Sequence, residues 1–208
     1  MTVADGQVYE WNNVTPPQSH SYLRARLDAI IAGRQWPPGA RALDFGCGNG
    51  SLSAALKRKG FAPVGVDISV SGVAVARQAF PDIVFSNDLS AENIARLGPY
   101  DVALCIEVIA HCFDPAAELK KIFDSLKPGG VLVLATPYYG YLKILVLALL
   151  GKLTAHHSVA SKANYVSMFT PGLITELLRD AGFTDIDIGR VGRIPALAKD
   201  MVVVARKP

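Results

Sequence analysis

The sequence predicts an α/β fold in which a mostly parallel, doubly wound β-sheet carries helices on both faces. Short apolar runs typical of strands alternate along the chain with stretches whose apolar residues recur at helical spacing. The fourth run, YDVALCIEV at Tyr100–Val108, is apolar almost throughout, as expected for a strand covered on both faces. Right-handed connections between parallel strands then give the doubly wound arrangement.

The first half of the chain contains four of the expected strands. An amphipathic helix is predicted from about Ser21 to Ala32, because Leu23, Leu27 and Ile30 lie on one face and Gly33 follows. After the break at WPPG, the expected elements are strand RALDF (41–45), a helix at 51–59, strand PVGVDI (63–68), a helix at 73–80, strand IVFSN (83–87), a helix at 90–97 and the strand at 100–108.

The second half repeats the alternation around one interruption. Asp114 and Pro115 are typical of a helix start, and KPGG turns into strand VLVLAT (131–136). Residues 138–169 break the pattern with an apolar segment and two adjacent histidines. Thr170 and Pro171 then begin a helix that ends at Gly182, and two strands close the chain, TDIDIGRV (184–191) and DMVVVAR (200–206). We expect a single domain over residues 1–208.

Composition sets broad limits on function. The chain of 208 residues is half hydrophobic and 19% charged, which indicates a well-packed globular protein. Its formal charge of +3 comes from scattered Lys and Arg, so nothing suggests nucleic-acid binding. Three cysteines in apolar sequence, Cys47, Cys105 and Cys112, are expected to be buried free thiols, which favours the cytoplasm. The N-terminus lacks the pattern of a secretion signal, and the apolar segment Tyr141–Gly151 has about half the length of a membrane span.

The stretch ALDFGCGNGSL places Gly46, Gly48 and Gly50 directly after the first strand. Glycines at this turn let a ligand rest against the main chain. The spacing is not that of a dinucleotide site, and the preceding Asp44 suits a positively charged ligand better than a pyrophosphate. Asp67 ends the second strand, where a carboxylate can accept hydrogen bonds from a ribose. S-adenosylmethionine fits these two features, because it carries an adenosine, an ammonium and a sulfonium.

Two other interpretations of this stretch are weaker. In the first, the glycines only form a tight turn and both aspartates cap helices. In the second, the protein is a nicotinamide-dependent reductase on a related fold, which the glycine spacing and Asp44 disfavour.

Several motifs occur in the order found in class I S-adenosylmethionine-dependent methyltransferases, and from about Arg41 onward the chain resembles that family. They are LDFGCGNG, GVDIS, SNDLS, YDVALCIEVIAHCFDP and LKPGGVLVLATP. The resemblance implies a Rossmann-like sheet of seven strands with an antiparallel last strand, and S-adenosylhomocysteine as product. The stretches CIEVIAHCFDP, TPYYGYLKILVLALLG and MFTPGLITELLRDAGF are most similar to the ubiquinone-biosynthesis O-methyltransferases.

The resemblance also implies the cofactor-binding residues. The glycine loop would hold the methionine end, Asp67 the ribose, and Asp88 the adenine amine; for Asp88, a helix cap or an Asx turn is an equal alternative. The full set of expected cofactor contacts is Asp44, Gly46, Cys47, Gly48, Gly50, Asp67, Ile68, Asn87, Asp88, Leu89 and Ile106.

Two residues after the fourth strand are candidate catalytic groups by the same resemblance. His111 is the candidate base that takes the acceptor's proton, and Glu107 matches the first glutamate of the family's Glu-x-x-Glu-His pattern. For each, a purely structural role in fixing the loop is an even alternative. Where the family has a second glutamate for a divalent cation, this chain has Ala110, so we expect no metal and doubt a catechol-type acceptor.

The acceptor is expected to be small or lipid-like and to be methylated at oxygen. We expect residues 1–35 to form an N-terminal helical cover, and the resemblance makes residues 138–169 a substrate cover. Candidate acceptor contacts are Tyr138, Tyr139, His156 and His157; alternatively, the tyrosines simply pack and the histidines face solvent. The apolar segment could form a lid, rest on a bilayer surface, or be buried against the sheet or a second subunit. The alternative function is an inactive S-adenosylmethionine-binding module that docks a partner through residues 141–151.

Overall fold

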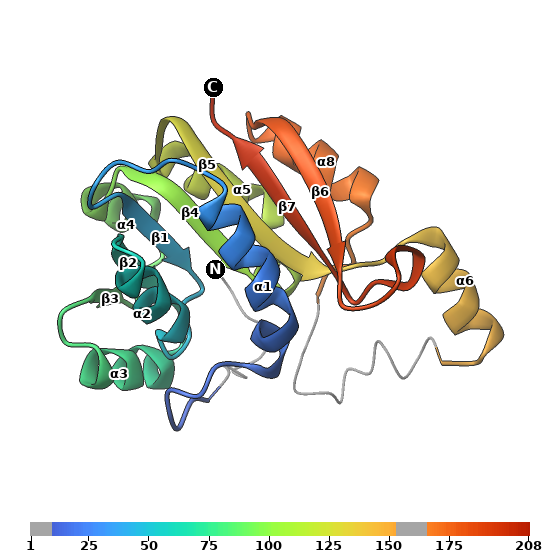
Figure 1. The fold of residues 1–208 in the computed structure, drawn as a ribbon, viewed down its shortest axis with the longest axis horizontal. Coiled ribbons are helices and arrows are strands. Elements are labelled where there is room, and N and C mark those ends of the chain that lie inside the picture. Colours follow the sequence, from blue (N-terminus) through green and yellow to red (C-terminus); the bar gives the residue numbers. More distant parts are fainter. Residues whose placement is uncertain (1–9, 153–165) are drawn as a thin grey trace.

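A sheet of seven strands forms the centre of the computed structural model, which describes residues 10–152 and 166–208 (Figure 1). The strand order is β3-β2-β1-β4-β5-β7-β6, and β7 runs antiparallel to both of its neighbours. This arrangement confirms the predicted fold class. The strands are β1 (Arg41–Phe45), β2 (Ala62–Val66), β3 (Val84–Ser86), β4 (Tyr100–Ile106), β5 (Leu126–Pro137), β6 (Thr184–Val191) and β7 (Asp200–Arg206).

Helices cover both faces of the sheet, and the alternation of side chains along β5 shows how. Leu134 joins one core with residues of α4, α5 and α8, whereas Val133 joins a second core with residues of α1 and α2. A smaller third cluster lies between α3 and β3. The helices are α1 (Gln18–Ala32), α2 (Ser51–Arg58), α3 (Val70–Ala79), α4 (Ala91–Leu97), α5 (Pro115–Ser125), α6 (Tyr141–Leu149) and α8 (Pro171–Asp180).

Side-chain caps fix where several helices begin. The Asp114 carboxylate accepts a hydrogen bond from the Ala117 N–H, and the Thr170 hydroxyl accepts one from the Leu173 N–H, as their positions in the sequence suggested. The third helix begins at Val70, three residues earlier than expected, because the Ser69 hydroxyl caps it by accepting from the Gly72 N–H.

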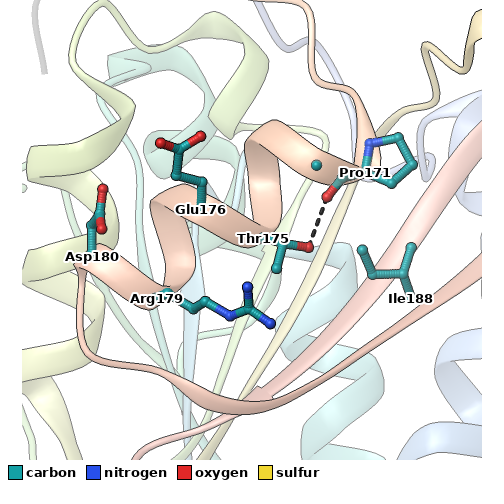
Figure 2. A pocket seen from close by; sticks show the side chains of 7 residues that line it. Pro171, Thr175, Glu176, Arg179, Asp180 and Ile188 are labelled. Atoms are coloured by element: carbon teal, nitrogen blue, oxygen red, sulfur yellow. Dashed lines mark hydrogen bonds between the residues drawn. The ribbon is translucent and has the colours of Figure 1, made fainter.

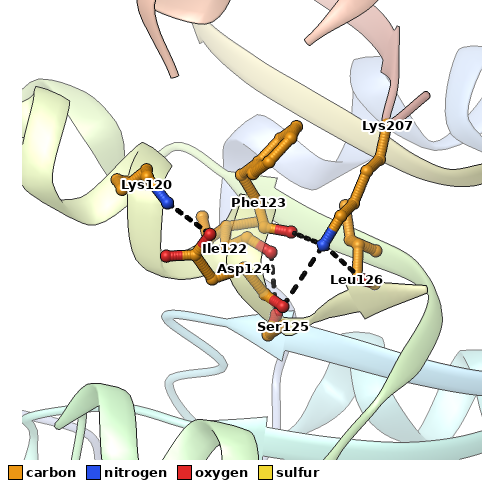
Figure 3. Close-up of polar contacts among 7 residues, drawn as sticks. All are labelled: Lys120, Ile122, Phe123, Asp124, Ser125, Leu126 and Lys207. Atoms are coloured by element: carbon orange, nitrogen blue, oxygen red, sulfur yellow. Dashed lines mark hydrogen bonds and ion pairs between the residues drawn. The ribbon is translucent and has the colours of Figure 1, made fainter. Parts of the chain in front are cut away.

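The junction between α5 and β5 also differs from the expectation. The strand begins at Leu126, directly after the helix, and not at Val131. The Lys207 ammonium, from the other end of the sequence, donates hydrogen bonds to the carbonyls of Phe123 and Leu126, both at 2.8 Å (Figure 3). A cation at this end of a helix satisfies its last carbonyls and opposes the helix dipole, so the chain needs no glycine to leave the helix.

Helix α6 exposes most of its apolar side chains and buries its lysine, which is the reverse of the usual pattern. Tyr141 and Leu149 are 83% and 77% exposed, whereas Lys143 is only 8% exposed and is the one residue of this helix that counts as buried. The Lys143 ammonium donates to the backbone carbonyls of Tyr138, Ala198 and Lys199. The structure therefore does not bury this helix against the sheet, and in Figure 1 it lies beyond the ends of the strands. Among the helices in the described part of the chain, none is long and apolar enough to cross a membrane.

We expect Leu134→Ala to lower the free energy of unfolding by about 2–5 kcal/mol, because it opens a cavity beside a fully buried central strand. The matched control is Leu142→Ala on α6, where the side chain is 49% exposed and the change should stay below about 1 kcal/mol. Urea unfolding measures both. Equal losses in the two variants would contradict the assignment of the core.

Candidate active site

The site lies between β1 and β4, where the order in which successive strands are added to the sheet reverses. Strand β1 pairs with β2 on one side and with β4 on the other, and the loops that follow these strands meet above the carboxyl ends. A Cβ atom on Gly46, after β1, would lie 2.2 Å from the Val108 Cγ2 atom, after β4. In doubly wound sheets this reversal point forms the ligand crevice.

The glycine loop needs its glycines for two reasons. Gly46, Gly48 and Gly50 have φ angles of +77°, +51° and +76°, which favour residues without a Cβ atom. A Cβ on Gly48 would also lie 2.4 Å from the Trp11 Cζ2 atom. The need for a tight turn therefore explains part of the glycine pattern, since the protein's own side chains fill the space that Cβ atoms would occupy.

Residues 11–15 form a strap across this loop, which sequence reasoning missed. The Trp11 N–H donates to the Ser71 hydroxyl at 3.1 Å. The Asn49 side-chain amide donates to the carbonyls of Asn13 and Thr15, at 2.8 and 2.9 Å. Asn49 is buried between the glycines, so the strap is held by the loop that it covers.

Asp67 joins the first and second crossover loops. Its Oδ2 atom accepts a hydrogen bond from the Gly48 N–H and its Oδ1 atom accepts one from the Ser69 N–H, both at 2.7 Å. Burial raises the pKa of Asp67, and the two amide bonds oppose that rise. Each carboxylate oxygen can accept a further hydrogen bond, and the residue is partly exposed.

Asp44 lies beneath the loop. It is 2% exposed, and its Oδ2 atom accepts a hydrogen bond from the Ser53 hydroxyl at 2.6 Å. Burial raises the pKa of Asp44 to about 7, and the charge of Asp67 adds to the rise. The neighbouring Cys47 is buried in the small cluster between α3 and β3. Asp44 thus supports the loop from below, through Ser53 of α2.

The residues expected near adenine gather after β2 and β3. The Asn87 side-chain amide donates to the carbonyls of Asp67 and Ser69, at 3.2 and 3.1 Å. The Asp88 carboxylate is exposed and accepts from the Ser90 N–H at 2.8 Å, which is an Asx turn. Leu89 is buried, and Ile68 is partly buried against the same core.

The end of β4 presents the two candidate catalytic residues. Glu107 has a φ angle of +60°, which is strained for a residue with a side chain, and its N–H donates to the Ala135 carbonyl. Burial raises the pKa of Glu107 to about 8, with a further contribution from the charge of Asp200. Ile106 is buried just before it, and His111, partly exposed, ends the short helix η2 (Ile109–His111).

The two tyrosines after β5 are buried. The Arg190 guanidinium lies 5.0 Å from the centre of the Tyr138 ring, and the Lys143 ammonium lies 5.4 Å from that of Tyr139. His156 and His157 lie outside the described residues. Within residues 10–152 and 166–208, no three His, Cys, Asp or Glu side chains are grouped to hold a metal ion.

Asp200 is a second residue that sequence reasoning missed. It opens β7 opposite Pro137 of β5, is 3% exposed, and acts on the pKa of Glu107. The one available signal was an acidic residue at the start of an otherwise apolar closing strand.

Two surface hollows lie away from the glycine loop. One lies between α8 and β6 and is lined by Thr175 and Arg179 of the helix and Ile188 of the strand (Figure 2). The other contains Arg34, Lys127 and Arg206 at the opposite edge of the sheet. Neither is at the carboxyl ends of β1 and β4, so neither is the crevice described above.

The raised pKa of Asp44 predicts a loss of stability with rising pH. The folded protein holds this proton more tightly than the unfolded chain, where the pKa is 3.8, so the stabilisation is complete below about pH 4 and is lost as the pH approaches 7. The loss is on the order of 4 kcal/mol. Asp44→Asn should remove this component, measured as urea unfolding from pH 4 to 8. The same slope in both proteins would contradict the assignment.

Gly48→Ala is expected to displace Trp11 and to cost at least about 1 kcal/mol more than Gly60→Ala. Gly60 is the matched control because its φ angle is also positive, +90°, but a Cβ atom there would meet nothing within 4 Å. Urea unfolding and tryptophan emission report the two effects. If the variants behave alike, the strap does not lie on the loop.

The chain matches a family model and named relatives. Residues 19–188 match the model described as "Methyltransferase domain". Over 133 residues the chain is 35% identical to a ubiquinone biosynthesis O-methyltransferase of Xanthomonas campestris, covering 61% of this chain and 55% of that protein. The protein of the same name from Psychrobacter arcticus is 31% identical over 157 residues, covering 72% and 61%. The chain thus spans between half and two thirds of the length of these relatives.

Solved structures share the fold. A methyltransferase from Archaeoglobus fulgidus, described as dependent on S-adenosylmethionine, superposes with a TM-score of 0.65 at 17% identity, covering 89% of this chain and 93% of that one. The cyclase SpnF gives 0.68 at 19% identity, covering 96% and 86%. Because fold neighbours this distant include a cyclase, the fold alone does not set the reaction. The family model covers most of the sequence, and the sheet has the expected seven strands with an antiparallel last strand, so the chain belongs to the methyltransferase domain family.

Proposed function

We propose that the protein transfers the methyl group of S-adenosylmethionine to a hydroxyl oxygen of a small or lipid-like acceptor. The observation that carries this proposal is the Asp67 carboxylate, bonded to the glycine loop at the reversal point of the sheet. The family match and the O-methyltransferase names of the relatives support the reaction type.

The residues at the crevice fit this cofactor. The main chain of Gly46–Gly50 would face the methionine end, the free lone pairs of Asp67 would accept from the ribose hydroxyls, and Ile106 would contact the cofactor through its backbone. Asn87, Asp88, Leu89 and Ile68 would surround the adenine. Asp67 and Glu107 give the crevice acidic walls, which suits a cationic ligand.

In this reaction the protein would mainly position the reactants and accept a proton. S-adenosylmethionine supplies an activated methyl group on a positively charged sulfur, a good leaving group. The protein would hold the acceptor oxygen in line with that methyl group. It would also accept the proton that the hydroxyl loses, for which His111 and Glu107 are the candidates at the end of β4.

Helix α6, which follows Tyr138 and Tyr139 along the chain, belongs to a part of the protein that exposes several apolar side chains. Leu142, Leu145 and Leu149 of α6 are exposed, and so are Met168 and Ile194. We place the acceptor beside this surface, close to Tyr138 and Tyr139. An exposed apolar surface favours a lipid-like acceptor and contact with a membrane surface. The three buried free cysteines are in keeping with a cytoplasmic protein.

The exposed face of α6 also favours a second candidate, an inactive cofactor-binding module that docks a partner there. Turnover separates the two. Transfer of radiolabelled methyl to any phenol, quinol or lipid in a screen removes the second candidate, and cofactor binding without any transfer favours it.

Asp67→Ala should raise the dissociation constant for S-adenosylmethionine at least about tenfold, because one charge-assisted hydrogen bond contributes about 1.5–3 kcal/mol. The control is Asp82→Ala, which removes a carboxylate that is 83% exposed and should leave the affinity unchanged. Calorimetric titration measures both. Absence of binding by the wild type at millimolar cofactor, or equal affinity in Asp67→Ala, would end the proposal.

A further inference from the structure

Three buried polar atoms without a hydrogen-bond partner lie at one edge of the sheet. At this edge the parallel strands β4 and β5 end and the antiparallel strand β7 begins. The three atoms are Glu107 Oε1, Thr136 Oγ1 and Asp200 Oδ2. Thr136 is fully buried and Asp200 is 3% exposed. Native structures rarely leave such atoms unpaired, because each costs about 1–3 kcal/mol.

The strand register brings the two carboxyl groups to the two sides of β5. The Glu107 N–H donates to the Ala135 carbonyl at 2.9 Å, and Asp200 pairs with Pro137 across the antiparallel ladder. The two groups act on each other, since the charge of Asp200 raises the pKa of Glu107. Burial is the main cause that raises the pKa of Tyr139, and the charges of Glu107 and Asp200 add to the rise. The carboxyl pair and Tyr139 are therefore close enough to influence one another's ionisation.

The neighbouring cations do not satisfy this pair. Lys143, on α6, directs its ammonium to three backbone carbonyls. Lys199 is exposed, and its ammonium lies 4.8 Å from the centre of the Tyr22 ring. Burial raises the pKa of Asp200, while a hydrogen bond from Tyr22 of α1 and the charges of Lys143 and Lys199 oppose the rise. Other titratable or charged groups on the neighbouring elements are His111 on η2, Arg190 beside the Tyr138 ring, and Arg193, whose charge acts on Lys143.

We propose, on the basis of the proposed function, that Glu107 and Asp200 form the acceptor subsite. The reacting hydroxyl donates to Glu107, and a second donor on the acceptor donates to Asp200. As the acceptor oxygen bonds to the methyl carbon, the carbon–sulfur bond breaks with its electron pair left on sulfur, and the hydroxyl proton passes to the ionised carboxylate form of Glu107. His111 is then not the base.

This subsite selects acceptors by charge. An anionic group beside these two carboxyl groups would lose its hydration without gaining an opposite charge, whereas a neutral donor would gain a hydrogen bond to a carboxyl oxygen. The ligand class is therefore a neutral molecule with two donors at its reacting end. A related molecule with a carboxylate beside the reacting hydroxyl should be rejected.

The test compares two probes on protein saturated with S-adenosylhomocysteine. The probes are catechol and 2,3-dihydroxybenzoate, which carries the same diol beside a carboxylate. We expect the wild type to bind catechol at least about tenfold more tightly, the equivalent of one charged contact. Asp200→Asn should weaken catechol binding about tenfold and should reduce the preference between the probes at least about fivefold, as measured by calorimetry. The control is Asp187→Asn on β6, where the side chain is 74% exposed and both values should be unchanged.

The outcomes separate this proposal from its alternatives. A purely structural role for Asp200 would weaken both probes alike and leave their ratio unchanged, which would overturn the proposal. Failure of the wild type to bind either probe would overturn it as well, whereas failure to bind S-adenosylhomocysteine would overturn the proposed function. Should Asp200→Asn not fold, Glu107→Gln carries the same ratio test. Full loss of methyl transfer in His111→Ala, with transfer intact in Glu107→Gln, would assign the proton to His111 instead.

Discussion

The crevice depends on one carboxylate. Asp67 accepts hydrogen bonds from the Gly48 and Ser69 amides, so a single side chain fixes the loop after β1 against the loop after β2. Asn87, from the loop after β3, adds two bonds to the same backbone. Three consecutive crossovers are thus held at one edge of the sheet. Since hydrogen bonds to a charged group are the stronger kind, the loop is shaped before any ligand arrives.

The same arrangement makes the crevice costly to fold. Burial raises the pKa values of Asp44, Asp67, Glu107 and Asp200, so their ionised forms are disfavoured in the folded protein. A well-packed apolar edge would be more stable. A cationic ligand reverses the balance, because it favours the ionised form of each nearby carboxyl group. A bound sulfonium would therefore relieve the cost of burying these carboxyl groups, and that relief would contribute to its binding energy.

The sequence predicted the sheet well because its signals are local. The closing strands, 184–191 and 200–206, have the bounds that alternation indicated, and the caps at Asp114 and Thr170 were visible as residue types. Contacts between distant parts of the chain were not visible. Nothing local shows that Lys207 reaches the end of α5, or that Trp11 lies on Gly48. Helix α6 was ambiguous for the same reason, since its one lysine is buried by carbonyls more than fifty residues away.

Asp200 illustrates what the fold adds to a motif. In the sequence, the loop after β4 has Ala110, which is small and buried, where the similar O-methyltransferases have a second glutamate. Read across the sheet, a carboxyl group stands beside Glu107 after all, supplied by the start of β7. An antiparallel last strand begins at the edge where the parallel strands end, so it can deliver a side chain to the crevice from the far end of the sequence. The chemistry of this edge is therefore set by its neighbours in space, and a count of acidic residues within one motif underestimates it.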